Sequence, residues 1–302
     1  MDASVSEGGP EAEEVLGRLP ARFRPFAEKM LERWLGRFVL RVTSTTIRIE
    51  LFDRSMTIAA QFFTSVFPIL ILIATLVGGA SDKVAETLDM PAQTKSVLED
   101  ALADNSSATF GLIGTLIVLI SATSLSRALT RAFAAIWELP RPKSKLMSAW
   151  RWVAVVLTLA LALIATRAVT RIANEIPPPV LWQIVGLMAL YVAMALFVPW
   201  ILLQGAVPLR QMLPAALIFG AVMMAMRPVS LVWLPRALET SADRYGSIGV
   251  AFTYLAWLYA VSFCFLAAQV VGEVLATDRG GFGRWIRGEP RRRARKPQPP
   301  AS

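Results

Sequence analysis

The side chains that could do chemistry in this sequence are few, and the most informative ones lie inside long apolar stretches. A charged or polar group in such a stretch is costly, which makes it a functional candidate by default. Arg227 stands beside Pro228 within the apolar stretch 212–234. Its cation could hold a substrate or act as a counter-ion. Alternatively, it could reach lipid headgroups from a depth that we expect to be nearer the outer leaflet than the midplane.

Two further candidates share one face of the last apolar stretch. Gln269 and Glu273 are four residues apart, a spacing that places both side chains on the same side of a helix. A buried Glu273 would need a cation, and Arg227 is one possible partner. A Glu273 at the cytoplasmic end would contact water instead, and its closeness to Asp278 and Arg279 favours this second interpretation.

Uncharged polar residues and prolines complete the candidates. Gln61 and Ser124 lie in the first and second apolar stretches, where such side chains either join helices or line a polar path. Proline removes a backbone donor and clashes with the carbonyl four residues earlier, so prolines inside these stretches are candidate helix breaks. Our candidates among them are Pro68, Pro199 and Pro228.

The usual catalytic sets are missing from the sequence. It contains no histidine, and its single cysteine, Cys264, lies in an apolar stretch. Common zinc sites and histidine-based acid–base catalysis are therefore excluded. No Walker loop and no carboxylate cluster predicts a nucleotide or magnesium site. We expect no catalytic residue, no metal and no cofactor, and a protein that is not an enzyme.

The elements that must position these candidates are predicted to be membrane-spanning helices. Hydrophobic residues make up 55% of the 302 residues and charged residues only 18%. The apolar residues gather in six blocks, most of them long enough to cross a hydrocarbon layer of about 30 Å. The third block is short, and arginines at both of its ends can reach the headgroups. The blocks are 58–79, 110–126, 152–166, 180–203, 212–234 and 248–276.

The sequence thus predicts an all-α polytopic membrane protein whose transmembrane domain is 58–276. Residues 1–22 are predicted to be disordered, and 277–302 to form a basic, proline-rich cytoplasmic tail. No cleavable signal peptide is seen, so we expect the first block to act as the targeting signal.

Residues 23–57 are predicted to form a cytoplasmic amphipathic helix at the membrane interface. Its cations and the tail are expected to contact anionic lipid headgroups, although the helix could instead pack on the cytoplasmic ends of the bundle. The cations are Lys29, Arg33, Arg37 and Arg41.

The distribution of basic residues orients the helices. Most of the 31 Lys and Arg residues fall on one side if both termini are cytoplasmic, as the positive-inside rule requires. The net charge of +9 is then explained by topology, and we expect no nucleic-acid partner. The opposite, exterior segments are predicted to be 80–109, 167–179 and 235–247.

Several stretches, taken in order, resemble the YihY/BrkB family of bacterial inner-membrane proteins, over about residues 35–277. The family usually has Gly-Ala-Glu near the end of its last span, where this chain has Ala267-Ala268-Gln269. The family also tends to have Asn at the position of Ala134. The stretches that carry the resemblance are Ser65-Val66-Phe67-Pro68, Gly111-Leu112-Ile113-Gly114, Ser121-Ala122-Thr123-Ser124, Arg127-Ala128-Leu129, Ile136-Trp137, Tyr245-Gly246-Ser247-Ile248-Gly249 and Leu255-Ala256-Trp257-Leu258-Tyr259.

The resemblance implies six spans, a bacterial cytoplasmic (inner) membrane location, and a link to envelope integrity, serum resistance and lipid or solute export. It also implies an older label, ribonuclease BN, which the absence of histidine argues against. Our leading hypothesis is transport or lipid handling at a polar site among the first, fifth and last spans. A non-transporting scaffold is the alternative, and a homo-oligomer is left open.

Overall fold

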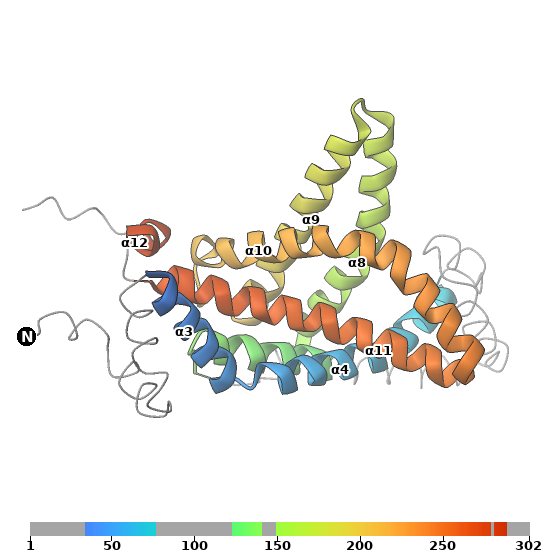
Figure 1. Cartoon of the computed structure of the whole chain (residues 1–302), viewed down its shortest axis with the longest axis horizontal. Helices are drawn as coiled ribbons and strands as arrows, with labels where there is room; N and C mark the ends of the chain where they lie inside the picture. Colours follow the sequence, from blue (N-terminus) through green and yellow to red (C-terminus); the bar gives the residue numbers. More distant parts are fainter. Residues whose placement is uncertain (1–33, 77–122, 141–148, 279–280, 289–302) are drawn as a thin grey trace, which may run out of the picture. The chain divides into compact units, whose positions relative to one another are not determined.

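The computed structural model describes residues 34–76, 123–140, 149–278 and 281–288. Every regular element that these residues form is a helix, which confirms the predicted all-α class (Figure 1). The chain divides into two compact units, Met1–Arg48 and Ile49–Ser302.

The first unit contributes one described helix, α3, Trp34–Arg48. Its last part is tied locally by the Ser44 hydroxyl, which donates to the Arg41 carbonyl at 3.0 Å. Glu50 adopts a positive φ of 52°, which L-residues disfavour, so the helix predicted over 23–57 does not run on to residue 57. Residues 51–57 belong to the next helix instead. Of the predicted headgroup contacts, Arg37 and Arg41 lie on α3, whereas Lys29 and Arg33 lie outside the described residues.

Among the described residues of the second unit, four helical stretches precede a long C-terminal hairpin. The side chains of the first are described as far as residue 65. The stretches are α4, Leu51–Leu76, the helical segment 123–136, α8, Ala149–Glu175, and α9, Pro179–Leu202.

Comparison with the predicted blocks shows where composition marks a helix end and where it does not. The block 180–203 nearly coincides with α9. The block 152–166 lies within the longer helix α8, which continues through Arg167 and Arg171 to Glu175. A backbone hydrogen-bond ladder does not stop where side chains become polar, so the arginines expected to flank this block lie within the helix.

The C-terminal hairpin is one helical run with a single reversal. It consists of α10, Leu209–Pro228, the π-helix η4, Val229–Trp233, and α11, Leu234–Thr277. Within α11, Gly246 has φ 61° and ψ −146°, a conformation that glycine adopts without strain. The segment 235–247, predicted as an exterior loop between spans, is therefore helical on both sides of that one residue.

The two arms of the hairpin run antiparallel and touch along their length (Figure 1). The Thr253 hydroxyl donates to the Ser241 Oγ at 2.8 Å near the reversal, and the rings of two tryptophans lie 6.5 Å apart further along. From the reversal towards the C-terminus, the paired residues are Ser241 and Thr253, Trp233 and Trp257, Met226 and Cys264, and Ala215 and Gly272.

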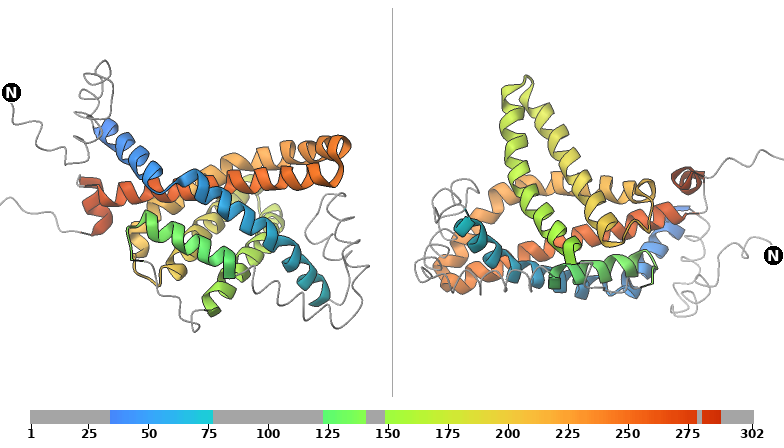
Figure 2. Two further views of the ribbon diagram at one scale, coloured as in Figure 1. Left: turned by 90° about the horizontal axis from the view of Figure 1, so that it is seen from below. Right: turned by 180° about the vertical axis from the view of Figure 1, so that it is seen from behind.

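Other helices cover this hairpin. The helix α9 packs against both α8 and α10, while α4 packs on α11 and runs antiparallel to its second arm (Figure 2). The rings of Phe52 and Phe263 stack at 5.3 Å between α4 and α11. A short final helix, α12, Gly281–Arg287, contacts both α10 and α11.

Two helical stretches of the described residues are long and apolar enough to cross a membrane, Pro179–Leu202 and Leu209–Thr277. The second has 69 residues, about 100 Å of helix, and it folds back at Gly246. The first three apolar blocks of the sequence lie wholly or partly outside the described side chains. The structure therefore supports membrane helices without testing the predicted number of six.

Candidate functional site

Arg227 lies near the middle of the helical hairpin. The neighbouring Met226 sulfur is 3.6 Å from the Cys264 sulfur, and Cys264 stands close to the centre of the apolar stretch 248–276. The helical run continues beyond the block 212–234, and the expected position of Arg227 nearer the outer leaflet than the midplane stays a prediction. The Arg227 side chain is partly buried, and no described residue forms an ion pair or hydrogen bond with its guanidinium.

Pro228 does not break the helix at this point. Its φ of −61° and ψ of −33° are helical, and the chain continues into the π-helix η4. There the Leu234 amide donates to the Val229 carbonyl, five residues back, and the Ser230 hydroxyl donates to the Arg227 carbonyl at 2.8 Å. The π-turn therefore directly follows the proline along the chain. Single π-turns of this kind are frequent at functional sites.

Gln269 is fully buried where α9, α10 and α11 meet. Its Nε2 donates to the Ala195 carbonyl of α9 at 3.4 Å, and its Oε1 has no hydrogen-bond partner among the described residues. Several small or apolar residues of these three helices have no exposed surface either. They are Ala195, Val198, Met212, Ala215, Ala216 and Leu266.

The suggested pairing of Arg227 with Glu273 is not formed. Glu273 follows Gly272, which lies directly against Ala215, and Ala215 is about 18 Å before Arg227 along α10. Glu273 is partly buried, and its carbonyl accepts a hydrogen bond from the Thr277 hydroxyl at 2.9 Å. The two charges therefore occupy different levels of the hairpin.

Gln61 also lies away from Gln269. Phe52 stacks on Phe263, and α4 runs antiparallel to the second arm of α11, so Gln61 lies further towards the Gly246 reversal (Figure 2). The Gln61 side chain is partly buried. The structure does not bring the residues of the first, fifth and last spans into one polar site.

The structure places the remaining three candidates, Pro68, Pro199 and Ser124, in different surroundings. The helix α4 continues across position 68, whose side chain is outside the described set. Pro199 is buried within α9, three residues before the helix ends at Leu202. Ser124 is partly buried on the stretch 123–136, whereas nearby Ser126 is fully buried and its Oγ has no described partner. The sequence contained both serines, but only tertiary packing distinguishes them.

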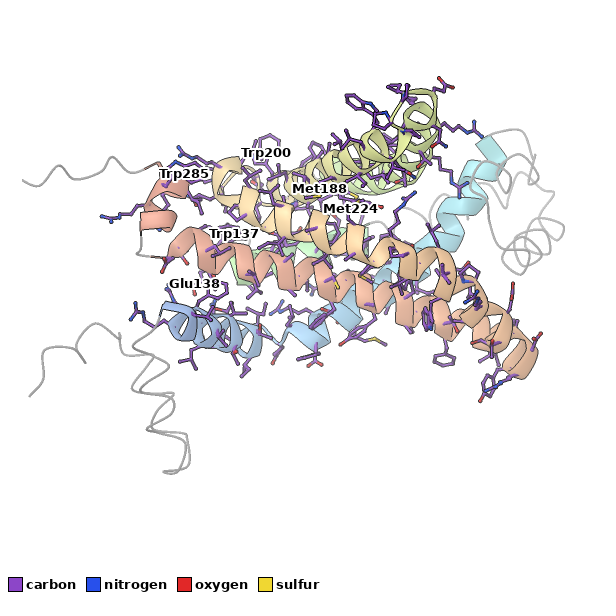
Figure 3. All side chains as sticks on the ribbon, turned by 45° about the horizontal axis from the view of Figure 1, so that its top comes forward. Trp137, Glu138, Met188, Trp200, Met224 and Trp285 are labelled. Carbon is purple, nitrogen blue, oxygen red and sulfur yellow. The ribbon has the colours of Figure 1, made fainter. Side chains whose placement is uncertain are left out.

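A basic cluster at the C-terminal end of α11 was missed. The Arg210 guanidinium donates to the Trp285 carbonyl at 2.6 Å and lies 5.4 Å from the Trp285 ring, and Arg287 donates to the Ala276 and Asp278 carbonyls at 2.7 and 3.0 Å. Trp200 and Trp285 lie towards this same end (Figure 3). Arginines near helix C-termini commonly satisfy the last carbonyls, but the sequence does not specify which ones.

No group of three or more metal-ligating side chains gathers within the part of the chain that the structure describes. In comparisons with known proteins, the model of the family described as Virulence factor BrkB matches residues 43–287. No curated protein and no solved structure matches the chain.

Proposed function

The chain belongs to the Virulence factor BrkB family, a family of membrane proteins, and we propose that it transports a solute or handles lipid in support of envelope integrity. It does so as a multi-pass, non-enzymatic protein of the bacterial cytoplasmic membrane, with both termini inside. The observation that carries the proposal is Arg227, a cation midway along an apolar helical hairpin.

The arrangement of the connecting segments supports this topology. The segments 204–211 and 277–302 are expected on the same side of the membrane, and Arg210 of the first contacts Trp285 of the second. The reversal at Gly246 is expected on the opposite side, and it lies at the other end of the hairpin. The residue Trp285 is exposed next to Arg284 and Arg287, as is typical of a membrane–water interface.

Arg227 supports a site for an anionic group. A guanidinium keeps its charge in proteins and holds phosphate or carboxylate in a fork of donors. Within an apolar segment such a group generally pairs with another charge or with water, yet no described residue provides an ion pair. The adjacent η4 has no buried side chain, so the helix surface beside Arg227 is accessible. A phosphate of a lipid or an anionic solute would complete this coordination.

One observation favours the alternative, a scaffold that transports nothing. The contact of Gly272 with Ala215 brings the backbones of α10 and α11 close together, as in helix pairs held by small residues. A scaffold would be expected to have such close packing along its whole length. The helix next to Arg227, η4, has no buried residue, and this favours transport.

Reconstitution into proteoliposomes tests the choice. Scrambling of a fluorescent anionic phospholipid and flux of small organic anions should be measured for the wild type, Arg227→Ala and Arg227→Lys. Arg236→Ala is the matched control, because Arg236 is exposed on the same hairpin. We expect Arg227→Ala to lose activity, Arg227→Lys to lose part of it and Arg236→Ala to keep it. Activity that is equal in all variants would refute the role of Arg227, and no activity in any of them would support the scaffold.

A further inference from the structure

The position of Pro199 leaves one carbonyl of α9 without its helical partner. In an α-helix each carbonyl accepts from the amide four residues later, and proline has no amide hydrogen. Since Pro199 lies inside α9, the carbonyl of Ala195 cannot receive that bond. The proline has thus created a specific need for one donor.

Water cannot meet this need. Ala195 has no exposed surface, and Gln269 of α11, whose Nε2 contacts the Ala195 carbonyl, has none either. A buried carbonyl without a partner destabilises the folded state by about the strength of a lost hydrogen bond. The donor must therefore come from a neighbouring side chain.

Gln269 is that donor. Its Nε2 reaches the Ala195 carbonyl at 3.4 Å across the interface between α11 and α9, and it is itself fully buried. The Gln269 Oε1 has no hydrogen-bond partner among the described residues, so the bond from Nε2 is the one that the side-chain amide forms with them. The reversed orientation of the amide would place two acceptors against each other, which supports the orientation seen.

We propose that Gln269 is a positioning residue whose amide replaces the helical hydrogen bond deleted by Pro199, so that α11 holds the last turn of α9. This turn leads directly into the connector 203–208, where Gln204 and Gly205 both have positive φ. The connector is followed by Arg210, which contacts α12. The inference concerns the fold and does not depend on the transport proposal.

A double-mutant cycle of Gln269→Leu and Pro199→Ala tests the pairing, with apparent Tm measured on the full-length protein in detergent. In the wild-type background Gln269→Leu should lower Tm by about 2–4 °C, the shift expected for one hydrogen bond in a chain of this size. In the Pro199→Ala background the alanine amide can serve the Ala195 carbonyl, so the same substitution should have little effect. Equal shifts in the two backgrounds would overturn the proposal.

Pro228→Ala provides the matched control. Pro228 also deletes a helical amide, but it is exposed and lies on α10, and its carbonyl partner would be Met224, which does not accept a hydrogen bond from Gln269. The Gln269→Leu shift should be the same with and without Pro228→Ala. If Pro228→Ala changed the Tm shift of Gln269→Leu as much as Pro199→Ala does, Gln269 would affect stability in general. This result would overturn the specific pairing of Gln269 with Pro199.

Hydrogen–deuterium exchange provides a second measurement if Pro199→Ala does not fold. Gln269→Leu should raise exchange in the last turn of α9 and in the connector, residues 199–206, and leave the first half of α9 unchanged. Exchange that is unaltered in 199–206, or raised equally along α9, would contradict the proposal.

Discussion

The helix α10 is packed against α11 in different ways at its two ends. At the packed end, which we define by Ala215, Gln269 and Gly272, three helices meet without exposed surface on Ala215 or Gln269. At the open end, defined by Arg227, Pro228 and η4, no residue of η4 is buried and the cation has no ion pair with a described residue. Both ends contain a polar group and lie near a proline in an apolar helix.

The difference shows that a polar group in an apolar helix can have two origins. At the packed end, Gln269 serves a need that Pro199 creates, so its presence is explained by the fold alone. At the open end, the backbone adjusts through a π-turn, and no described group needs the guanidinium of Arg227. Function is therefore better sought at the open end.

The largest effect is expected from removing the ring that joins three helices at the packed end. Phe265 contacts Phe219 of α10 at 4.7 Å and Phe133 of the stretch 123–136 at 5.5 Å between ring centroids. Phe265→Ala should destabilise the folded state by about 3–5 kcal/mol, measured as the loss of apparent Tm and of monodisperse protein in detergent. Phe252→Ala, at a ring that is 67% exposed on the same helix, is the control. Similar losses in both would erase the contrast between packed and exposed rings.

A smaller effect is expected from adding one methyl group at the packed end. A Cβ at Gly272 would lie 2.6 Å from the backbone nitrogen of Ala215, which cannot move without separating the helices. Gly272→Ala should cost about 1–3 kcal/mol in thermal unfolding. The control is Gly220→Ala, where the new Cβ meets the flexible end of Met188 at 2.9 Å. If Gly220→Ala is the more harmful change, the close approach at Gly272 is not what fixes the helix pair.

The contacts of α12 extend the comparison beyond the hairpin. Arg287→Ala removes two hydrogen bonds to carbonyls at the C-terminal end of α11, each with a net worth of about 1 kcal/mol. Hydrogen–deuterium exchange should rise across residues 276–288, whereas exposed Arg284→Ala should leave it unchanged. Identical exchange in the two variants would mean that α12 is held by other contacts.

The smallest effect on stability is expected at the open end. Arg227→Leu removes a partly buried cation that no described residue pairs with, so apparent Tm should stay within about 1 °C or rise slightly. Arg236→Leu serves as the exposed reference. A fall of several degrees confined to Arg227→Leu would show that the guanidinium has a structural partner, which would remove the distinction between the two ends.

Much of the helical architecture could be predicted from the sequence. The block 180–203 matches α9 almost residue for residue, because polar and proline-containing segments adjoin both of its ends. The helix α8 and the first arm of α11 extend beyond the apolar blocks for a common reason. Composition marks where side chains suit hydrocarbon, whereas a helix ends where its hydrogen-bond ladder ends, and polar residues such as Arg171 and Glu239 extend that ladder.

The candidate residues were easier to select than to group. Gln269 and Arg227 are polar residues in apolar stretches, so the sequence is enough to show that burying them is costly. The sequence also shows that the carbonyl of Ala195 lacks its helical donor, because Pro199 has no amide hydrogen. Which side chain supplies the donor depends on how α11 packs against α9, and that is a long-range contact. The position of Arg227 along the hairpin likewise depends on where the hairpin turns, which the single residue Gly246 decides.

The one-residue reversal at Gly246 bears on how the chain is made. In the proposed topology the two arms are joined without a flexible linker, because the helix reverses at this one residue. The charged tip, including Arg236, Glu239 and Asp243, has to cross the hydrocarbon layer to reach the opposite side. A nascent chain stopped before Gly246 would display the unpaired face of α10, a state that the insertion machinery must shield until the second arm arrives.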